Sequence, residues 1–148
     1  MNQTPIVLIH GLWNSPRLFR QLINYVDCDC YHIFIPHLRH DLGKKRIHSL
    51  AVQLDSQINR EFGPKTNIDI VGFSMGGLIS RVWLQKLGGA SRTNRFISIG
   101  TPHHGTYTAQ LIPSCLFPGI ADMKRGSDLV LDLNSELKTL KDIECIVF

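Results

Sequence analysis

The feature that most constrains the fold is a glycine–serine turn placed between a strand and a helix. Residues 67–72 (NIDIVG) have the apolar, β-branched character of a strand buried on both faces. The pentapeptide 72–76 (GFSMG) follows directly, and an amphipathic helix is predicted from Met75 to Leu87, ended by Gly88 and Gly89. A G-x-S-x-G pattern occurs by chance in about one chain of this size in twenty. The strand–turn–helix setting therefore carries more weight than the pattern.

The same alternation of strand and helix runs along the whole chain. Amphipathic helices are predicted after Ser15-Pro16 and over 47–62, and Ser127 and Ser135 are predicted to cap two short helices near the end. Strands are predicted at Thr4–Ile9, Tyr31–Ile35, Asn67–Gly72, Arg95–Ile99 and Ile143–Phe148. Alternating elements indicate an α/β fold with a mostly parallel sheet and helices on both faces. We expect one domain, residues 1–148.

Composition excludes several classes of function. The net charge of +4 comes from scattered basic residues without a basic stripe, so we expect no nucleic-acid partner. No apolar run approaches the ~20 residues of a membrane span, and no signal peptide opens the chain, so a cytoplasmic location is expected. The four cysteines (Cys28, Cys30, Cys115 and Cys145) lack zinc-ligand spacing, and no metal or organic cofactor is implied.

Ser74 is the residue in this pattern that could carry chemistry. A sharp turn between strand and helix needs Gly72 and Gly76, because a Cβ at either position would collide with neighbouring backbone. The turn would hold Ser74 at the carboxyl end of the sheet, beside a helix amino terminus whose amides favour developing negative charge.

Four segments carry a resemblance to a known family: 6–13 (IVLIHGLW), 69–77 (DIVGFSMGG), 101–105 (TPHHG) and, more weakly, 126–134. In this order they resemble small α/β-hydrolases of the lipase type, including compact bacterial and cyanobacterial lipase-like and esterase-like proteins. The resemblance implies a minimal α/β-hydrolase fold acting on carboxylic esters, with an acylglycerol-like lipid or a short acyl ester as the small-molecule substrate.

The resemblance also implies roles for individual residues. Ser74 would be the nucleophile that forms an acyl-enzyme. The backbone amides of Met75 and Leu12 would form the oxyanion hole, and His10 would fix the turn after the first strand by hydrogen bonding.

In this family an acid and then a histidine follow the serine along the chain, each after a later strand. Here the strand expected before the acid is 143–148, where the sequence stops. We therefore expect a truncated relative that lacks the last strand and helix. Two alternatives stay open: a catalytically silent or fragmentary relative, and an acyltransferase or thioesterase that uses the same residues.

Other residues could substitute for the missing base. His103 and His104 follow the strand after Ser74, and in the family this segment shapes the rim of the active site. They are candidates for the base or for a rim position. His37, His40 and His48 are expected to be exposed to solvent.

Candidate acids are named by position alone. Asp122, Asp128 and Asp132 could serve, although helix capping or solvation explains each of them, and Asp69 is expected to form an ion pair or a turn contact. Residues 103–121 are predicted to form a lid-like or acyl-binding loop with an apolar part at 107–120, or an ordinary packed loop.

Overall fold

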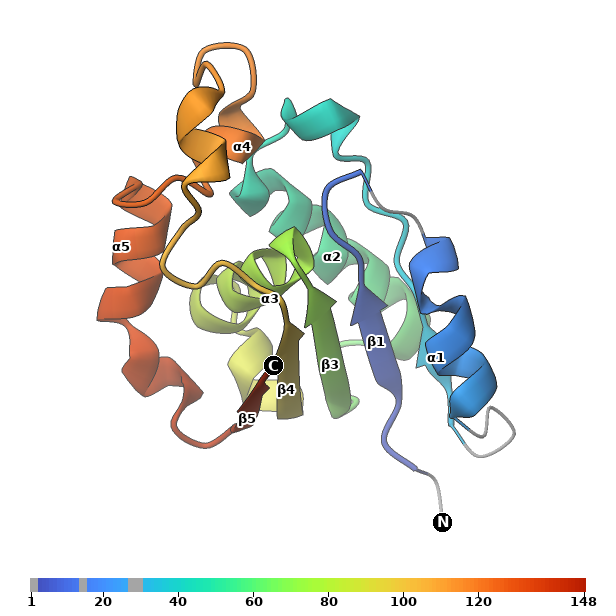
Figure 1. Cartoon of the computed structure of the whole chain (residues 1–148). Helices are drawn as coiled ribbons and strands as arrows, with labels where there is room; N and C mark the ends of the chain where they lie inside the picture. The colour runs from blue at the N-terminus through green and yellow to red at the C-terminus, as the bar shows by residue number, and fades with distance from the viewer. Residues whose placement is uncertain (1–2, 14–15, 27–30) are drawn as a thin grey trace.

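A five-stranded parallel sheet forms the centre of the chain (Figure 1). The computed structural model describes residues 3–13, 16–26 and 31–148. The strands are β1 (Ile6–Ile9), β2 (Ile33–Phe34), β3 (Ile68–Phe73), β4 (Thr93–Ile99) and β5 (Glu144–Val147), in the spatial order β2-β1-β3-β4-β5. The helices are α1 (Arg20–Tyr25), α2 (Ile47–Phe62), α3 (Met75–Lys86), α4 (Pro118–Ala121) and α5 (Asp128–Ser135). The predicted parallel α/β sheet is confirmed.

The two faces of the sheet are covered unequally. Val7 and Ile9 of β1 point into the large core shared with α2 and α3, whereas Leu8 between them points into a small cluster with Phe19 and Val71. This is the alternation that a strand imposes on its side chains. The α2–α3 face therefore holds most of the buried apolar surface.

Helix α3 is the most deeply buried helix in the described part of the chain. Every side chain from Met75 to Gln85 is buried, and the Trp83 indole donates from Nε1 to Asp55 Oδ1 of α2 at 2.9 Å. Helix α2 buries only its apolar stripe, as its sequence period predicts. Because α3 is fixed on all sides, the turn that leads into it is held rigidly.

Several predicted boundaries differ from the structure. The strand expected at 31–35 is reduced to Ile33–Phe34, since Pro36 removes a donor immediately after it. Ser127 caps α5 as predicted, by accepting from Val130 N. Ser135 is the last residue of α5 and donates to Asp132 O at 2.7 Å, so it does not begin the next helix as predicted. The segment 103–121 is not a plain loop, because it contains a 3₁₀ helix and α4. The predicted cap Ser15 lies outside the described residues.

The carboxyl ends of the parallel strands bring separate turns together. Ser74 follows β3, Gly11 lies in the turn after β1, and Gly100 follows β4. In parallel sheets this edge is where ligands bind. Within the described ranges, no helix has the length and apolar character that a membrane crossing requires.

Candidate active site at the carboxyl edge of the sheet

Ser74 has a strained backbone between β3 and α3. Its φ of 53° and ψ of −124° lie in a region that L-residues with a Cβ avoid, at a cost of roughly 1–2 kcal/mol. Two hydrogen bonds hold this conformation, from Ser74 N to Ile99 O at 2.8 Å and from Gly77 N to Ser74 O at 3.0 Å. The surrounding fold therefore maintains a conformation that the isolated chain would leave.

Close backbone packing explains the glycines around Ser74. A Cβ at Gly76 would lie 2.2 Å from Ile9 O, and one at Gly72 would lie 2.6 Å from the Cα of Gly77. A side chain at either position would therefore collide with backbone, as predicted. A Cβ at Gly11 would lie 2.9 Å from Ser74 Cβ and 3.3 Å from its Oγ, so the turn after β1 packs directly on the serine.

The Ser74 side chain is half-buried, and its Oγ has no hydrogen-bond partner among the residues that the structure describes. Met75 is the first residue of α3, where a backbone N–H has no acceptor within its own helix. Leu12 lies in the turn that Gly11 presses against Ser74. The arrangement can stabilise an anion beside Ser74, as the assignments of Leu12 and Met75 require.

His10 and His40 form a buried pair in this region. Nδ1 of His10 lies 3.1 Å from Gly11 O and 3.2 Å from Nε2 of His40. The prediction that His40 is exposed is wrong, because its connection folds against the end of β1 and buries Leu38 and His40 together. Burial lowers the pKa of His10, and burial with the nearby His10 lowers the pKa of His40 to about 4.

His103 has its ring atoms occupied by structural contacts. Its Nε2 lies 2.8 Å from Ser98 Oγ, and its Nδ1 lies 3.4 Å from an NH1 of Arg81. Burial and the Arg81 charge lower its pKa to about 4. His104 Nδ1 lies 3.4 Å from the amide nitrogen of Asn134. Neither histidine is hydrogen-bonded to Ser74, so the structure brings no base to the serine within the described residues.

A buried arginine organises the segment that carries these histidines. Arg81 of α3 is only 2% exposed, and it donates to Asn134 Oδ1 at 3.0 Å and to Leu133 O at 2.7 Å. Asn134 in turn donates to His103 O at 3.0 Å. This network was not predicted from the sequence, although an arginine between the apolar residues Ile79 and Val82 of α3 was a signal for it.

The candidate acids have structural partners or lie at helix ends. Asp122 is buried; it accepts from Ile47 N at 2.9 Å at the start of α2 and pairs with Arg46 at 2.8 Å. Asp132 pairs with Lys86 at 2.8 Å, and Asp128 is the first residue of α5. Asp122 thus bonds the first N–H of α2 from a distant part of the chain, and its burial rules out the predicted solvation. Asp69 pairs with Arg95 at 3.6 Å, which confirms the predicted ion pair.

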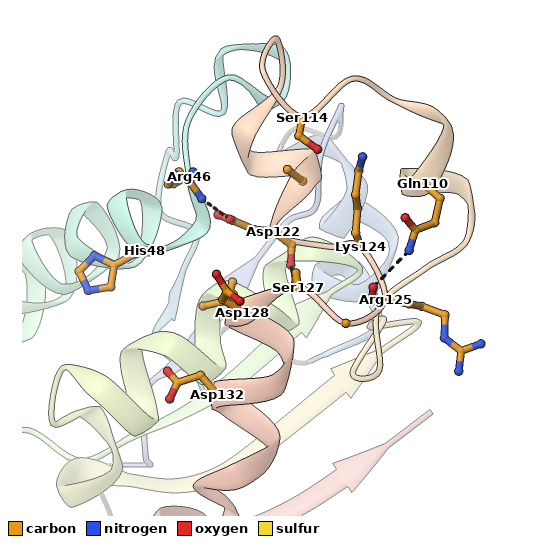
Figure 2. Close-up of a pocket in the computed structure, with 13 residues that line it drawn as sticks. Arg46, His48, Gln110, Ser114, Asp122, Lys124, Arg125, Ser127, Asp128 and Asp132 are labelled. Carbon is orange, nitrogen blue, oxygen red and sulfur yellow. Dashed lines mark hydrogen bonds and ion pairs between the residues drawn. The ribbon is translucent and has the colours of Figure 1, made fainter.

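Two cavities lie near the segment 103–121. A cleft of about 600 Å³, lined mostly by polar and charged residues, runs between the start of α2, with Arg46 and His48, and the start of α5, with Ser127 and Asp128 (Figure 2). A second cavity, of about 220 Å³ and mostly apolar, is lined by residues including His103, His104, Leu137 and Val147. Ser74 lines neither cavity.

The segment 103–121 is anchored at some points and exposed at others. Ala109 and Ile120 are buried in the main core, whereas Tyr107, Leu111 and Leu116 are exposed. The Tyr107 hydroxyl accepts from Arg125, whose guanidinium also lies over the Tyr107 ring. The buried residues fit the predicted packed loop, and the exposed apolar residues fit the predicted acyl-binding loop. Both stay predictions.

Within the described ranges, no group of three or more histidine, cysteine or acidic side chains could hold a metal ion.

Comparison with known proteins bears on the fold. A family model described as alpha/beta hydrolase fold matches residues 4–141. No curated protein sequence gives a significant match.

Three of the similar solved structures are hydrolases. Mature lipase BlEst2 from Bacillus licheniformis has a TM-score of 0.76 at 20% identity, over 99% of this chain and 65% of that chain. The metagenomic carboxyl esterase MGS0156 has a TM-score of 0.80 at 15% identity, over 99% and 49%. Phospholipase PlaB from Legionella pneumophila has a TM-score of 0.72 at 16% identity, over 98% and 38%. This chain thus spans less than two thirds of the length of each.

Proposed function

Because this chain belongs to the α/β-hydrolase fold family, we propose that it supplies the nucleophile and the oxyanion donors of a serine ester hydrolase. Ser74 attacks the carbonyl carbon of a carboxylic ester, the alcohol leaves, and water then releases the acid from the acyl-enzyme. The amides of Met75 and Leu12 stabilise the negative charge that develops on the carbonyl oxygen.

The strained conformation of Ser74 is the observation that carries this proposal. A φ of 53° at a serine is unfavourable, and the packing of Gly11, Gly72 and Gly76 against neighbouring backbone and Ser74 maintains it. Strain that the surrounding structure over-determines is typical of functional positions. The substrate class is taken from the names of the similar structures, a lipase, a phospholipase and a carboxyl esterase.

A second candidate is a silent member of the fold that binds esters without cleaving them. It is favoured by the absence, in the described part of the chain, of a histidine hydrogen-bonded to Ser74. Removal of a triad member lowers rates by several orders of magnitude.

Imidazole added from solution separates the two candidates, because it can serve as the missing general base. We expect hydrolysis of p-nitrophenyl acetate to rise with imidazole concentration above the rate given by imidazole and a matched Ser74→Ala protein. Equal rates for the two proteins at every imidazole concentration, with both folded, would favour the silent member. Longer p-nitrophenyl acyl esters then measure the preferred chain length.

A further inference from the structure

The buried pair of His10 and His40 at the end of β1 takes no direct part in the proposed reaction of Ser74. His10 is 2% exposed and His40 is 8% exposed, and their ring centroids are 4.9 Å apart with an interplanar angle of 69°. His10 directly follows β1, whereas His40 comes from the connection between β2 and α2. Buried polar groups are costly unless they are hydrogen-bonded, so this contact needs a reason.

Hydrogen-bond chemistry assigns the protons of the pair. Gly11 O lies 3.1 Å from Nδ1 of His10 and can only accept, so the His10 proton is on Nδ1. With this tautomer Nε2 of His40, 3.2 Å from the same Nδ1, is a second acceptor of the His10 proton. The His40 proton then lies on its own Nδ1, which, like Nε2 of His10, is buried without a hydrogen-bond partner among the described residues. Both rings are neutral at neutral pH, because burial lowers the pKa of each of them.

The carbonyl held by His10 belongs to the residue packed against the serine. An atom at the Cβ position of Gly11 would lie 2.9 Å from Ser74 Cβ, so only a glycine allows the turn after β1 to pack this close to the serine. The next residue is Leu12, whose amide is the proposed second oxyanion donor. A shift of the Gly11 carbonyl would turn the peptide that carries this amide.

We propose that His40 is a positioning residue that orients the His10 ring and, through the Gly11 carbonyl, the peptide of Leu12 beside Ser74. This inference rests on the proposed function, because orienting the Leu12 peptide matters for the reaction only if an oxyanion forms beside Ser74. His40 touches neither the substrate nor Ser74, and it acts through His10.

The kinetic consequence differs from that of a simple loss of stability. The oxyanion exists only in the transition state and the intermediate, so misplacement of one donor lowers kcat and leaves KM nearly unchanged. Loss of a whole donor costs roughly 100- to 1,000-fold in kcat, so a misplaced donor should cost about tenfold or more.

Three variants test this in the imidazole-assisted assay. His40→Leu removes the acceptor, His40→Gln retains an acceptor near the Nε2 position, and His37→Leu removes an exposed ring from the same connection. We expect His40→Leu to lower kcat by about tenfold or more with KM within about twofold, while His40→Gln and His37→Leu stay near the wild type. Equal kcat in His40→Leu and His37→Leu would overturn the proposal, as would a loss confined to KM.

Two-bond ¹⁵N–¹H spectra of the histidine rings give an answer that does not depend on turnover. We expect the His10 proton on Nδ1 in the wild type, and displaced Gly11 and Leu12 amide resonances in His40→Leu but not in His37→Leu. A His10 proton on Nε2, or unmoved amides, would overturn the proposal. If the wild type shows no turnover that depends on Ser74, the proposed function fails. The spectra then still show whether His40 positions the His10 ring and the Leu12 peptide. If His40→Leu does not fold, the wild-type ring spectrum and His40→Gln decide.

Discussion

The turns after β3 and β4 lie side by side at the same edge of the sheet, and Ser74 in the first and His103 in the second differ in their hydrogen bonding. Phe73 pairs with Ile99 in the ladder, so the two turns start at the same level. Ser74 has a strained backbone and an unpartnered hydroxyl in the described structure, whereas His103 is held by Ser98 and Arg81. Position at this edge of the sheet thus does not leave a side chain available: the Ser74 hydroxyl is open to a ligand, whereas the His103 ring is held by the fold.

The largest expected effect comes from Gly76→Ala. Its Cβ would lie 2.2 Å from Ile9 O, and backbone on both sides cannot yield, so we expect a loss of about 3 kcal/mol or more in the free energy of unfolding, or no folded protein. The control is Gly88→Ala, where an added Cβ meets no atom within 4 Å and only the left-handed φ of 81° opposes the substitution, so about 1 kcal/mol is expected. Urea denaturation measures both. Equal losses of unfolding free energy in the two variants would show that the fold does not depend on the tight packing of the Ser74 turn.

Arg81→Met tests whether the turn after β4 is structural. It leaves Leu133 O and Asn134 without a charged donor, and we expect a loss of about 2–4 kcal/mol. Removing this charge should also raise the pKa of His103. NMR titration of the ring measures that pKa, with exposed Arg95→Met as the control. An unchanged His103 pKa in a folded variant would contradict the network.

Acid should weaken the fold through His10, His40 and His103, because burial lowers the pKa of each. His40 and His103 titrate near 4 in the folded chain against 6.5 when unfolded, so the unfolded chain binds more protons between these values. Stability should therefore be nearly constant above the unfolded pKa of 6.5 and fall by roughly 4 kcal/mol toward pH 4, with the share of partly exposed His103 reduced for solvent screening.

Urea denaturation of His103→Gln and His48→Gln over this range sharpens the acid prediction. His103→Gln should flatten the curve, and the exposed His48→Gln should not. Identical curves for the wild type and His103→Gln would show that His103 is not buried neutral.

The smallest expected effect is that of Ser98→Ala. It removes the hydroxyl 2.8 Å from His103 Nε2 and should cost about 1 kcal/mol, because one buried hydrogen bond is lost. Ser56→Ala, whose hydroxyl bonds only the preceding turn of α2, is the control. If Ser98→Ala instead created Ser74-dependent hydrolysis without imidazole, the turn after β4 would hold a latent base, and the contrast between the turns would fail.

Much of the fold followed from local patterns in the sequence. The apolar stripe at 47–62 predicts α2 with its observed bounds, and the β-branched segment before Gly72 predicts β3, because both depend on residue spacing alone. The strained turn at Ser74 was also predictable, since glycines flank it. The burial of His40 and the Arg81–Asn134 contact could not be predicted, because they join residues 30 and 53 positions apart.

Labelling of the purified chain with a fluorophosphonate, mapped by peptide mass spectrometry, tests the central claim most directly. We expect a covalent adduct on Ser74 and on no other serine, formed faster when imidazole is added and absent from Ser74→Ala. A folded sample that stays unlabelled with imidazole present, or an adduct that forms equally on other serines, would contradict the assignment of Ser74 as the nucleophile.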